Sequence, residues 1–137
     1  MNSRFLRSAP FFKESGLEKL ENSHVAVFGI GGVGGHAVDA LARAGVGTLD
    51  LIDSDTVSIT NINRQLLATH STVGRLKVEV AKERILDISP ETTVHTYPIF
   101  YTPETADQFD FTQYDYIVDA IDTVTGKLCL AERAFAA

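Results

Sequence analysis

Apolar residues follow two patterns along the chain, and the two patterns alternate. Short apolar runs rich in β-branched and aromatic residues predict buried strands. These runs are 24–30, 48–53, 93–99 and 114–121. Between them, apolar residues recur every three or four positions, which predicts helices. Strands that alternate with helices specify a parallel sheet with right-handed crossovers, so we predict an α/β, Rossmann-like fold with helices on both faces.

The helices are predicted from their apolar stripes and their end signals. The first stripe ends at Gly45, a typical C-terminal residue, and consists of Val33, Ala37, Ala40, Leu41 and Ala44. The second helix is expected to have Ser71–Thr72 as its capping region and Pro90 beyond its end. Its stripe consists of Val78, Ala81, Ile85 and Ile88. We also expect a helical turn over 103–109 and an alanine-rich helix that runs to Ala137.

The length of 137 residues allows one domain but not both halves of a complete dinucleotide-binding fold. We predict an N-terminal arm and helix over 1–23 and a nucleotide-binding domain over 24–137 that is truncated before its second half. The polar, Asn-rich segment 53–67 is too long for an ordinary connection, which favours a functional loop.

Gly29, Gly31 and Gly34 match the pattern G-x-G-x-x-G between the first predicted strand and the first predicted helix. The first glycine permits a tight turn, the second lets backbone N–H groups approach phosphate, and the third lets the helix pack on the strand. Asp53 ends the next strand, where an acid can bind ribose hydroxyls. The sequence therefore predicts a nucleotide site, with a glycine-rich packing turn as the alternative.

The glycine motif does not separate ATP from NAD, but three charged residues favour ATP. A triphosphate attacked at its α-phosphorus needs cations around the developing charge, which Arg64 and Lys77 can supply. Lys77 lies near a helix start, where the helix dipole disfavours a cation by about 0.3–1 kcal/mol. It is off the apolar stripe, so it need not be buried, and a solvated surface lysine is the alternative.

Asp122 ends the fourth predicted strand, which should lie beside the first strand at the topological switch point. We therefore expect Asp122 to face the glycine loop. A carboxylate beside a triphosphate suits Mg²⁺, which takes one or two carboxylates together with phosphate oxygens and water. The alternative is that Asp122 is the N-cap of the last helix.

Charge and cysteine content narrow the classes of function. The net charge of −6 argues against broad electrostatic binding of nucleic acid, although residues 1–13 carry Arg4, Arg7 and Lys13 and no acid. The single Cys129 excludes an internal disulfide and a four-cysteine zinc site, and we expect it to be a packing residue. No apolar run approaches the ~20 residues that cross a bilayer, so we expect no membrane span and a cytoplasmic protein.

The chain resembles the MoeB/ThiF/HesA superfamily, relatives of the ubiquitin-activating enzymes. The resemblance rests on the segments VFGIGGVG (27–34), LIDSDTV (51–57), TNINRQ (60–65), VGRLK (73–77) and DAID (119–122). Within the superfamily it is most similar to the tRNA threonylcarbamoyladenosine dehydratase group, through RFLRS (4–8), GLEKL (16–20) and AKERIL (81–86). Members continue into a second half with a functional cysteine, so the resemblance implies that this chain is an N-terminal portion.

The resemblance implies ATP and Mg²⁺ as cofactors and assigns roles to individual residues. Gly32 and Lys77 would contact the phosphates, Asp53 the ribose, and Asp122 the magnesium ion. Asn61 and Arg64 would surround phosphate and adenine, with Asp55 also at the nucleotide. The family is dimeric, and Arg7 is the candidate for an arginine that reaches the triphosphate of the other subunit in a homodimer.

The implied function is ATP-dependent adenylation of a carboxylate with release of pyrophosphate, in the reaction that cyclises threonylcarbamoyladenosine on tRNA. A second hypothesis is adenylation of the C-terminus of a ubiquitin-like sulfur-carrier protein. A third, of a different class, is a non-catalytic nucleotide-binding module or a fragment of an NAD-dependent oxidoreductase. The basic arm favours the tRNA substrate, and Arg64, Lys77 and Asp122 count against NAD.

Overall fold

The structure is a computed structural model that describes residues 2–137. Its centre is a four-stranded sheet in the order β3-β2-β1-β4, and every neighbouring pair of strands is parallel. The strands are β1 (His24–Phe28), β2 (Thr48–Ile52), β3 (Thr93–Tyr97) and β4 (Tyr116–Asp119). The predicted order, with the fourth strand beside the first, is therefore confirmed.

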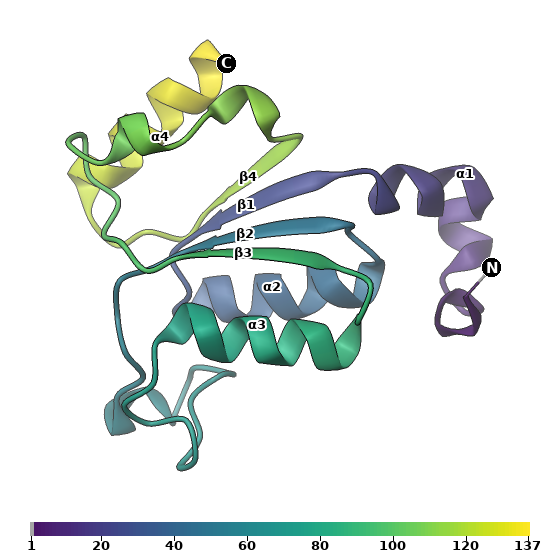
Figure 1. Ribbon diagram of the computed structural model, residues 1–137, viewed down its shortest axis with the longest axis horizontal. Coiled ribbons are helices and arrows are strands. Elements are labelled where there is room, and N and C mark those ends of the chain that lie inside the picture. Colours follow the sequence, from purple (N-terminus) through teal and green to yellow (C-terminus); the bar gives the residue numbers. More distant parts are fainter. Residues whose placement is uncertain (1) are drawn as a thin grey trace.

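Helices cover both faces of the sheet (Figure 1). Helices α2 (Gly32–Ala44) and α3 (Lys77–Ile88) pack side by side on one face, and α4 (Val124–Ala136) lies on the other. Short 3₁₀ turns at Ala106–Gln108 and Phe111–Gln113 accompany α4. The predicted α/β, Rossmann-like fold with helices on both faces is confirmed.

Each face of the sheet has its own hydrophobic core. The face under α2 and α3 buries aliphatic residues, among them Val27, Leu49 and Ile85. The opposite face buries an aromatic cluster in which the Phe28 ring lies 4.9 Å from that of Tyr101. Burial on both faces explains why the strands read as continuous apolar runs.

The inner face of α2 differs from the predicted stripe. Val33 is 72% exposed, whereas the buried residues are Gly34, Gly35, Val38 and Ala42. The reason is the close contact between helix and strand: a Cβ atom on Gly34 would lie 1.7 Å from the Gly29 carbonyl oxygen. Small residues therefore define the inner face, although the sequence pattern favoured the larger Val33.

The predicted start of the second helix is wrong, although its stripe of Val78, Ala81 and Ile85 is fully buried as expected. Helix α3 begins at Lys77, and Ser71–Thr72 lie in turns before it. The Thr72 hydroxyl donates to the Leu67 carbonyl oxygen at 2.8 Å and so stabilises the loop. Gly74, with a φ of 87°, keeps the chain out of a helix until after that position.

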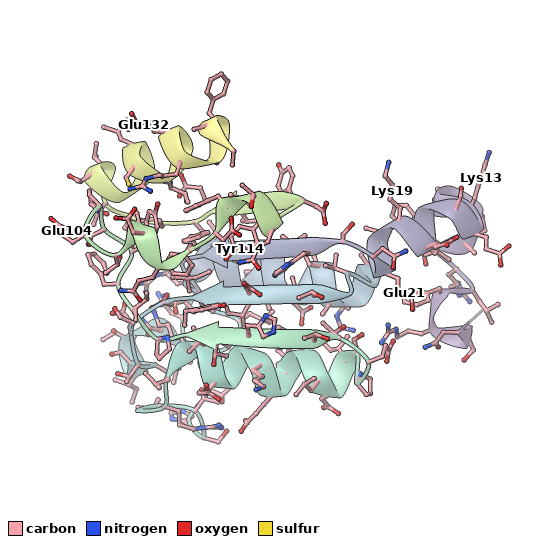
Figure 2. The ribbon with its side chains drawn as sticks, turned by 45° about the horizontal axis from the view of Figure 1, so that its top comes forward. Lys13, Lys19, Glu21, Glu104, Tyr114 and Glu132 are labelled. Atoms are coloured by element: carbon pink, nitrogen blue, oxygen red, sulfur yellow. The ribbon has the colours of Figure 1, made fainter. Side chains whose placement is uncertain are left out.

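The N-terminal arm is folded onto the end of the sheet where the strands begin (Figure 1). Helix α1 (Ala9–Glu21) is kinked at Lys13, which points into solvent together with Lys19 (Figure 2). Arg4 donates to the Ile88 carbonyl oxygen and to Glu91, both at 2.7 Å. Arg4 is thus used to dock the arm, while its neighbour Arg7 is exposed.

No helix among residues 2–137 combines the length and the apolar character that crossing a membrane requires.

Candidate nucleotide-binding site

A cleft of about 560 Å³ opens at the end of the sheet where the strands terminate. Its walls come from the segments that follow β1, β2, β3 and β4, and from the first residue of α3. In open α/β sheets, ligands bind outside the carboxyl ends of the strands, where the strand order changes direction. Here the chain crosses from β3 at one edge to β4 at the other, so the cleft beside β1 is at that point.

The glycine turn forms the floor of the cleft. Gly29 has a φ of 95°, and its N–H donates to the Ile52 carbonyl oxygen at 2.8 Å, which ties the turn to the end of β2. A Cβ atom on Gly32 would meet no protein atom within 4 Å. Gly31 and Gly32 stand at the N-terminus of α2, where unpaired backbone N–H groups and the helix dipole attract anions. The turn is therefore shaped to receive phosphate.

Asp53, directly after β2, is fixed by backbone donors. Its Oδ2 accepts from the Ile30 N–H and its Oδ1 from the Asp55 N–H, both at 2.7 Å. Each carboxylate oxygen can accept more than one hydrogen bond, so the oriented carboxylate still has acceptor capacity for a ribose hydroxyl. Asp53 thus joins the glycine turn to the loop that carries Asp55.

Lys77 is buried, although its position off the apolar stripe did not require burial. Its side chain is 8% exposed, and its Nζ lies 4.0 Å from Asp55 Oδ2. The reason is that the loop over 53–76 folds back on the start of α3, where the Lys77 N–H donates to the Asp55 carbonyl oxygen at 3.0 Å. The alternative of a solvated surface lysine is therefore wrong. A largely desolvated ammonium in a cleft attracts an anion more strongly than an exposed one does.

Arg64 also lines the cleft, and it is held by its own loop. Its guanidinium donates to the Thr60 carbonyl oxygen and to Asn63, both at 3.0 Å. Asn61 is buried and absent from the lining of the cleft. Its side chain instead accepts from the Ser58 N–H at 2.8 Å in a capping box, and its carbonyl oxygen accepts from the Arg64 N–H. In this structure Asn61 positions the loop that carries Arg64.

Asp122 lies in the same cleft as the glycine turn, on the loop between β4 and α4. Strand β4 ends at Asp119, earlier than predicted, and the N-cap of α4 is Thr123. The alternative reading of Asp122 as the helix cap is therefore wrong. Its exposed carboxylate is available to the interior of the cleft.

Lys127 is a cleft residue that the sequence pattern did not reveal. It lies on α4, and its Nζ is 3.2 Å from Asp119 Oδ1. The signal was weak, since Lys127 sits in an alanine-rich helix outside the motif segments. Lys127 lies one turn after the start of α4. The sequence alone does not say where α4 lies relative to the cleft, so it does not predict the contact of Lys127 with Asp119.

Aromatic residues after β3 form the remaining wall of the cleft. Phe100 is 54% exposed, whereas Tyr101 is 4% exposed and its hydroxyl lies 3.6 Å from Cys129 Sγ. Burial, followed by the hydrogen bond with Cys129, raises the pKa of Tyr101, so its phenol is neutral near pH 7. Cys129 packs against the aromatic core, as expected of a packing residue.

The donor set of the cleft fits a divalent cation bound together with phosphate. Carboxylates outnumber cationic side chains in the lining, which holds Asp53, Asp55, Asp119 and Asp122 beside Arg64, Lys77 and Lys127. Asp53 is engaged by backbone N–H groups and Asp119 by Lys127, which leaves Asp55 and Asp122 as the more exposed carboxylates. Mg²⁺ prefers such a set of one or two carboxylates with phosphate oxygens.

A glycine turn, an oriented acid after the second strand and a cleft at the switch point define the class of this protein as a Rossmann-like nucleotide-binding domain. The chain belongs to the ThiF family, whose model matches residues 3–137. The part of the match that lies in the cleft includes the glycine turn, Asp53, Lys77 and Asp122.

Three relatives illustrate the range of the similarity. The chain is 51% identical over 133 residues to the tRNA threonylcarbamoyladenosine dehydratase of Bacillus subtilis, covering 97% of this chain and 52% of the relative. It is 42% identical over 134 residues to the adenylyltransferase and sulfurtransferase UBA4 of Vanderwaltozyma polyspora, covering 96% and 30%. The crystal structure of the Escherichia coli dehydratase TcdA in complex with ATP aligns with a TM-score of 0.90 at 44% identity, covering 93% and 52%.

The chain spans about half the length of the dehydratases it matches.

Proposed function

We propose that this chain binds ATP with Mg²⁺ in the cleft and that the protein adenylates a substrate carboxylate. The observation that carries the proposal is the convergence of the glycine turn with the buried Lys77 and with Asp122 in one cleft. A relative of nearly the same fold, the Escherichia coli dehydratase, has been crystallised with ATP and with AMP. These two nucleotides are the reactant and the final nucleotide product of a carboxylate-adenylating reaction.

The residues of the cleft divide the work of binding and stabilisation. Backbone N–H groups at Gly31 and Gly32 bind phosphate, and Asp53 accepts hydrogen bonds from the ribose. Asp122 holds Mg²⁺, with Asp55 as the second exposed carboxylate. A carboxylate oxygen of the substrate forms a bond to the α-phosphorus while the bond to the leaving pyrophosphate breaks. Lys77 and Arg64 stabilise the negative charge that gathers on the phosphoryl oxygens in this step.

The proposed substrate is the threonylcarbamoyladenosine carboxylate on tRNA, and the activated carboxylate is then attacked within the same modified nucleoside to close a ring. The support for this substrate is the 51% identity to the Bacillus subtilis dehydratase over 97% of the chain. The similarity to UBA4 favours the second candidate, the C-terminal carboxylate of a ubiquitin-like carrier protein. Both candidates use the same cleft chemistry.

A homodimer in which Arg7 enters the cleft of the other subunit is part of the proposal. Arg7 is exposed and belongs to the N-terminal arm, which Figure 1 shows at the end of the sheet where the strands begin. The cleft is lined by the segments that follow the strands, at the opposite end. Arg7 therefore does not line the cleft of its own chain. An arginine in this position contributes to the reaction only by acting on a second copy.

The first test is the choice of nucleotide. Isothermal titration of the chain with ATP and NAD, each with Mg²⁺, is expected to give tighter binding of ATP. Omission of Mg²⁺ should weaken ATP binding in the wild type much more than in Asp122→Asn. Tighter binding of NAD than of ATP would overturn the proposal in favour of an oxidoreductase fragment.

The second test is ATP–pyrophosphate exchange, which reports reversible adenylation of a carboxylate. Exchange that depends on tRNA bearing threonylcarbamoyladenosine is the expected result, and unmodified tRNA is the control. Exchange that depends instead on a carrier protein with a free C-terminus would move the assignment to the second candidate. ATP binding without exchange on either substrate would contradict the proposed enzyme and leave a non-catalytic nucleotide-binding module.

A further inference from the structure

Two histidines and one aspartate come together on the sheet, away from the nucleotide cleft. His24 Nε2 and His95 Nδ1 each lie 2.8 Å from the same oxygen of Asp50, Oδ1. The three residues come from β1, β2 and β3, and Asp50 pairs in register with His95. None of the three lines the nucleotide cleft. His24 is the first residue of β1, whereas the glycine turn follows the last residue of that strand, and Asp50 and His95 are the middle residues of β2 and β3.

The charge of Asp50 is the unusual feature of this cluster. Its side chain is only 1% exposed, and its ion-pair partners among residues 2–137 are the two histidines alone. A buried carboxylate without a cation is costly, and neutral imidazoles supply hydrogen bonds but no positive charge. A cation bound at the shared Oδ1 would supply that positive charge.

The donor atoms match a transition-metal site. We propose that His24 Nε2, Asp50 Oδ1 and His95 Nδ1 bind a divalent transition-metal ion, with Zn²⁺ as the best fit. Two imidazole nitrogens with one carboxylate oxygen form a known three-ligand set for zinc with an open fourth position. With bonds of about 2.0–2.2 Å in a tetrahedron, neighbouring ligand atoms are roughly 3.3 Å apart. The three atoms already lie within 4.8 Å of one another, so small side-chain shifts admit the ion.

The surroundings hold the ligands in place. The Tyr114 hydroxyl donates to Asp50 Oδ2 at 3.2 Å, which orients the carboxylate and leaves Oδ1 toward the histidines. The Tyr114 ring also packs edge-on against the His24 ring, at 5.1 Å between centroids (Figure 2 labels Tyr114 over the sheet). Metal sites regularly contain residues that hydrogen-bond to the ligands and so hold them in orientation.

Solvent can reach the cluster from the side of His95. The His95 side chain is 49% exposed and that of His24 is 19% exposed, which gives an ion a path of entry. A water molecule would complete the tetrahedron at the open position. A ring nitrogen that binds a metal carries no proton, so the ion would replace the two contacts between the histidine nitrogens and Asp50 Oδ1. Protons compete with the ion for these ligand atoms, so the affinity should fall as the pH is lowered.

The test is metal binding by the untagged 137-residue chain after removal of metal with EDTA, in the absence of nucleotide. Titration calorimetry with ZnCl₂ at pH 7.5 should give one ion per chain. His24→Gln and His95→Gln should each lower the affinity at least 10-fold. The matched controls His36→Gln and His70→Gln, which change exposed histidines outside the cluster, should bind as the wild type does. Mutation of a residue that hydrogen-bonds to a metal ligand typically costs about 10–100-fold in metal affinity. Loss of a ligand itself should cost at least as much.

Cobalt provides a second readout that does not depend on variant stability. The Co²⁺ form of the wild type should absorb in the visible range with the intensity of a tetrahedral site, and one equivalent of Zn²⁺ should remove the band. Absence of stoichiometric binding in the wild type would overturn the proposal. So would unchanged affinity in both cluster variants.

Discussion

Gly32 and Gly34 lie two positions apart, yet an added methyl group meets different surroundings at each. At Gly34 it would lie 1.7 Å from a backbone oxygen, and at Gly32 it would meet nothing within 4 Å. We expect Gly34→Ala to destabilise the protein by about 3 kcal/mol or more, at or above the top of the usual range for overpacking. Gly32→Ala should keep its Tm and lose ATP affinity, because the methyl group occupies the approach to the phosphates. Thermal unfolding and ATP titration of both variants separate the two roles.

Two results would contradict this division of roles between the glycines. The first is unchanged stability of Gly34→Ala, and the second is normal ATP affinity of Gly32→Ala.

Lys77 gives a prediction for a single charge. Lys77→Ala should lower the affinity for ATP with Mg²⁺ by roughly 10- to 100-fold, since a hydrogen bond to a charged group contributes about 1.5–3 kcal/mol. Its effect on Tm should be small, because it removes a buried ammonium along with its contact to Asp55. The matched control is Lys82→Ala on the same helix and outside the cleft, which should bind ATP normally. Equal losses in the two variants would show that Lys77 has no special role.

Single residues also mark the limit of what the sequence predicts. The glycine motif, Asp53 and Asp122 could be placed at one cleft, because strand order and the ends of apolar runs position them. The burial of Lys77 could not be predicted, since it depends on a loop that folds back through the Lys77 N–H. Lys127 was missed because its role depends on the distance between two separate elements. Asp50, His24 and His95 were missed because their contact arises from strand register.

At the scale of elements, the apolar pattern identified every strand of the sheet but extended each one too far. Strand β1 ends at Phe28, although Ile30 is 1% exposed and was assigned to the strand. The positive φ of Gly29 turns the chain out of the sheet, and Ile30 is buried in the turn beyond it. Apolar content reports burial, whereas the end of a strand is a property of the backbone. The late start of α3 also depends on the backbone, because the positive φ of Gly74 separates the predicted capping residues Ser71–Thr72 from the helix.

The pair of helices α2 and α3 gives a pH-dependent prediction. Burial favours the neutral form of the Asp39 carboxyl, but hydrogen bonds from Arg43 at 2.9 Å and Arg84 at 2.7 Å outweigh it and lower its pKa below 3.8. Because its pKa is lower in the folded state, the ionised Asp39 carboxylate stabilises the fold above about pH 4. This contribution is lost as the pH falls through the folded-state pKa. Asp39→Asn should therefore lower the free energy of unfolding at pH 7 by about 1 kcal/mol, which corresponds to a decrease in Tm of roughly 4 °C. The difference from the wild type should vanish near pH 2.

The control for Asp39 is the ion pair between Arg75 and Glu83, which is 2.6 Å long but exposed. Glu83→Gln should leave Tm nearly unchanged, because exposed ion pairs contribute little. Thermal unfolding from pH 2 to pH 8 compares the two variants. If Glu83→Gln lowered Tm as much as Asp39→Asn does, the result would contradict a special stabilising role for the Asp39–Arg84 contact between α2 and α3.

For the whole molecule, the proposed homodimer leads to a prediction about mixed dimers, because Arg7 is not among the residues that line the cleft of its own chain. Arg7→Ala and Lys77→Ala should each abolish exchange when assayed alone. In an equal mixture that has re-equilibrated, half of the dimers contain both variants, and each of these has one site with an intact cleft and an intact arm. Activity should therefore return to about a quarter of the wild-type value.

The matched mixture of Lys77→Ala with Asp122→Ala keeps both lesions in the cleft, so no dimer has an intact site and activity should not return. Recovery only in the first mixture requires that the arm of one chain serves the cleft of another. An Arg7→Ala variant with normal exchange would remove the arm from the reaction. The basic charge of the arm would then act only in attaching the arm to the domain, as Arg4 does at the C-terminal end of α3.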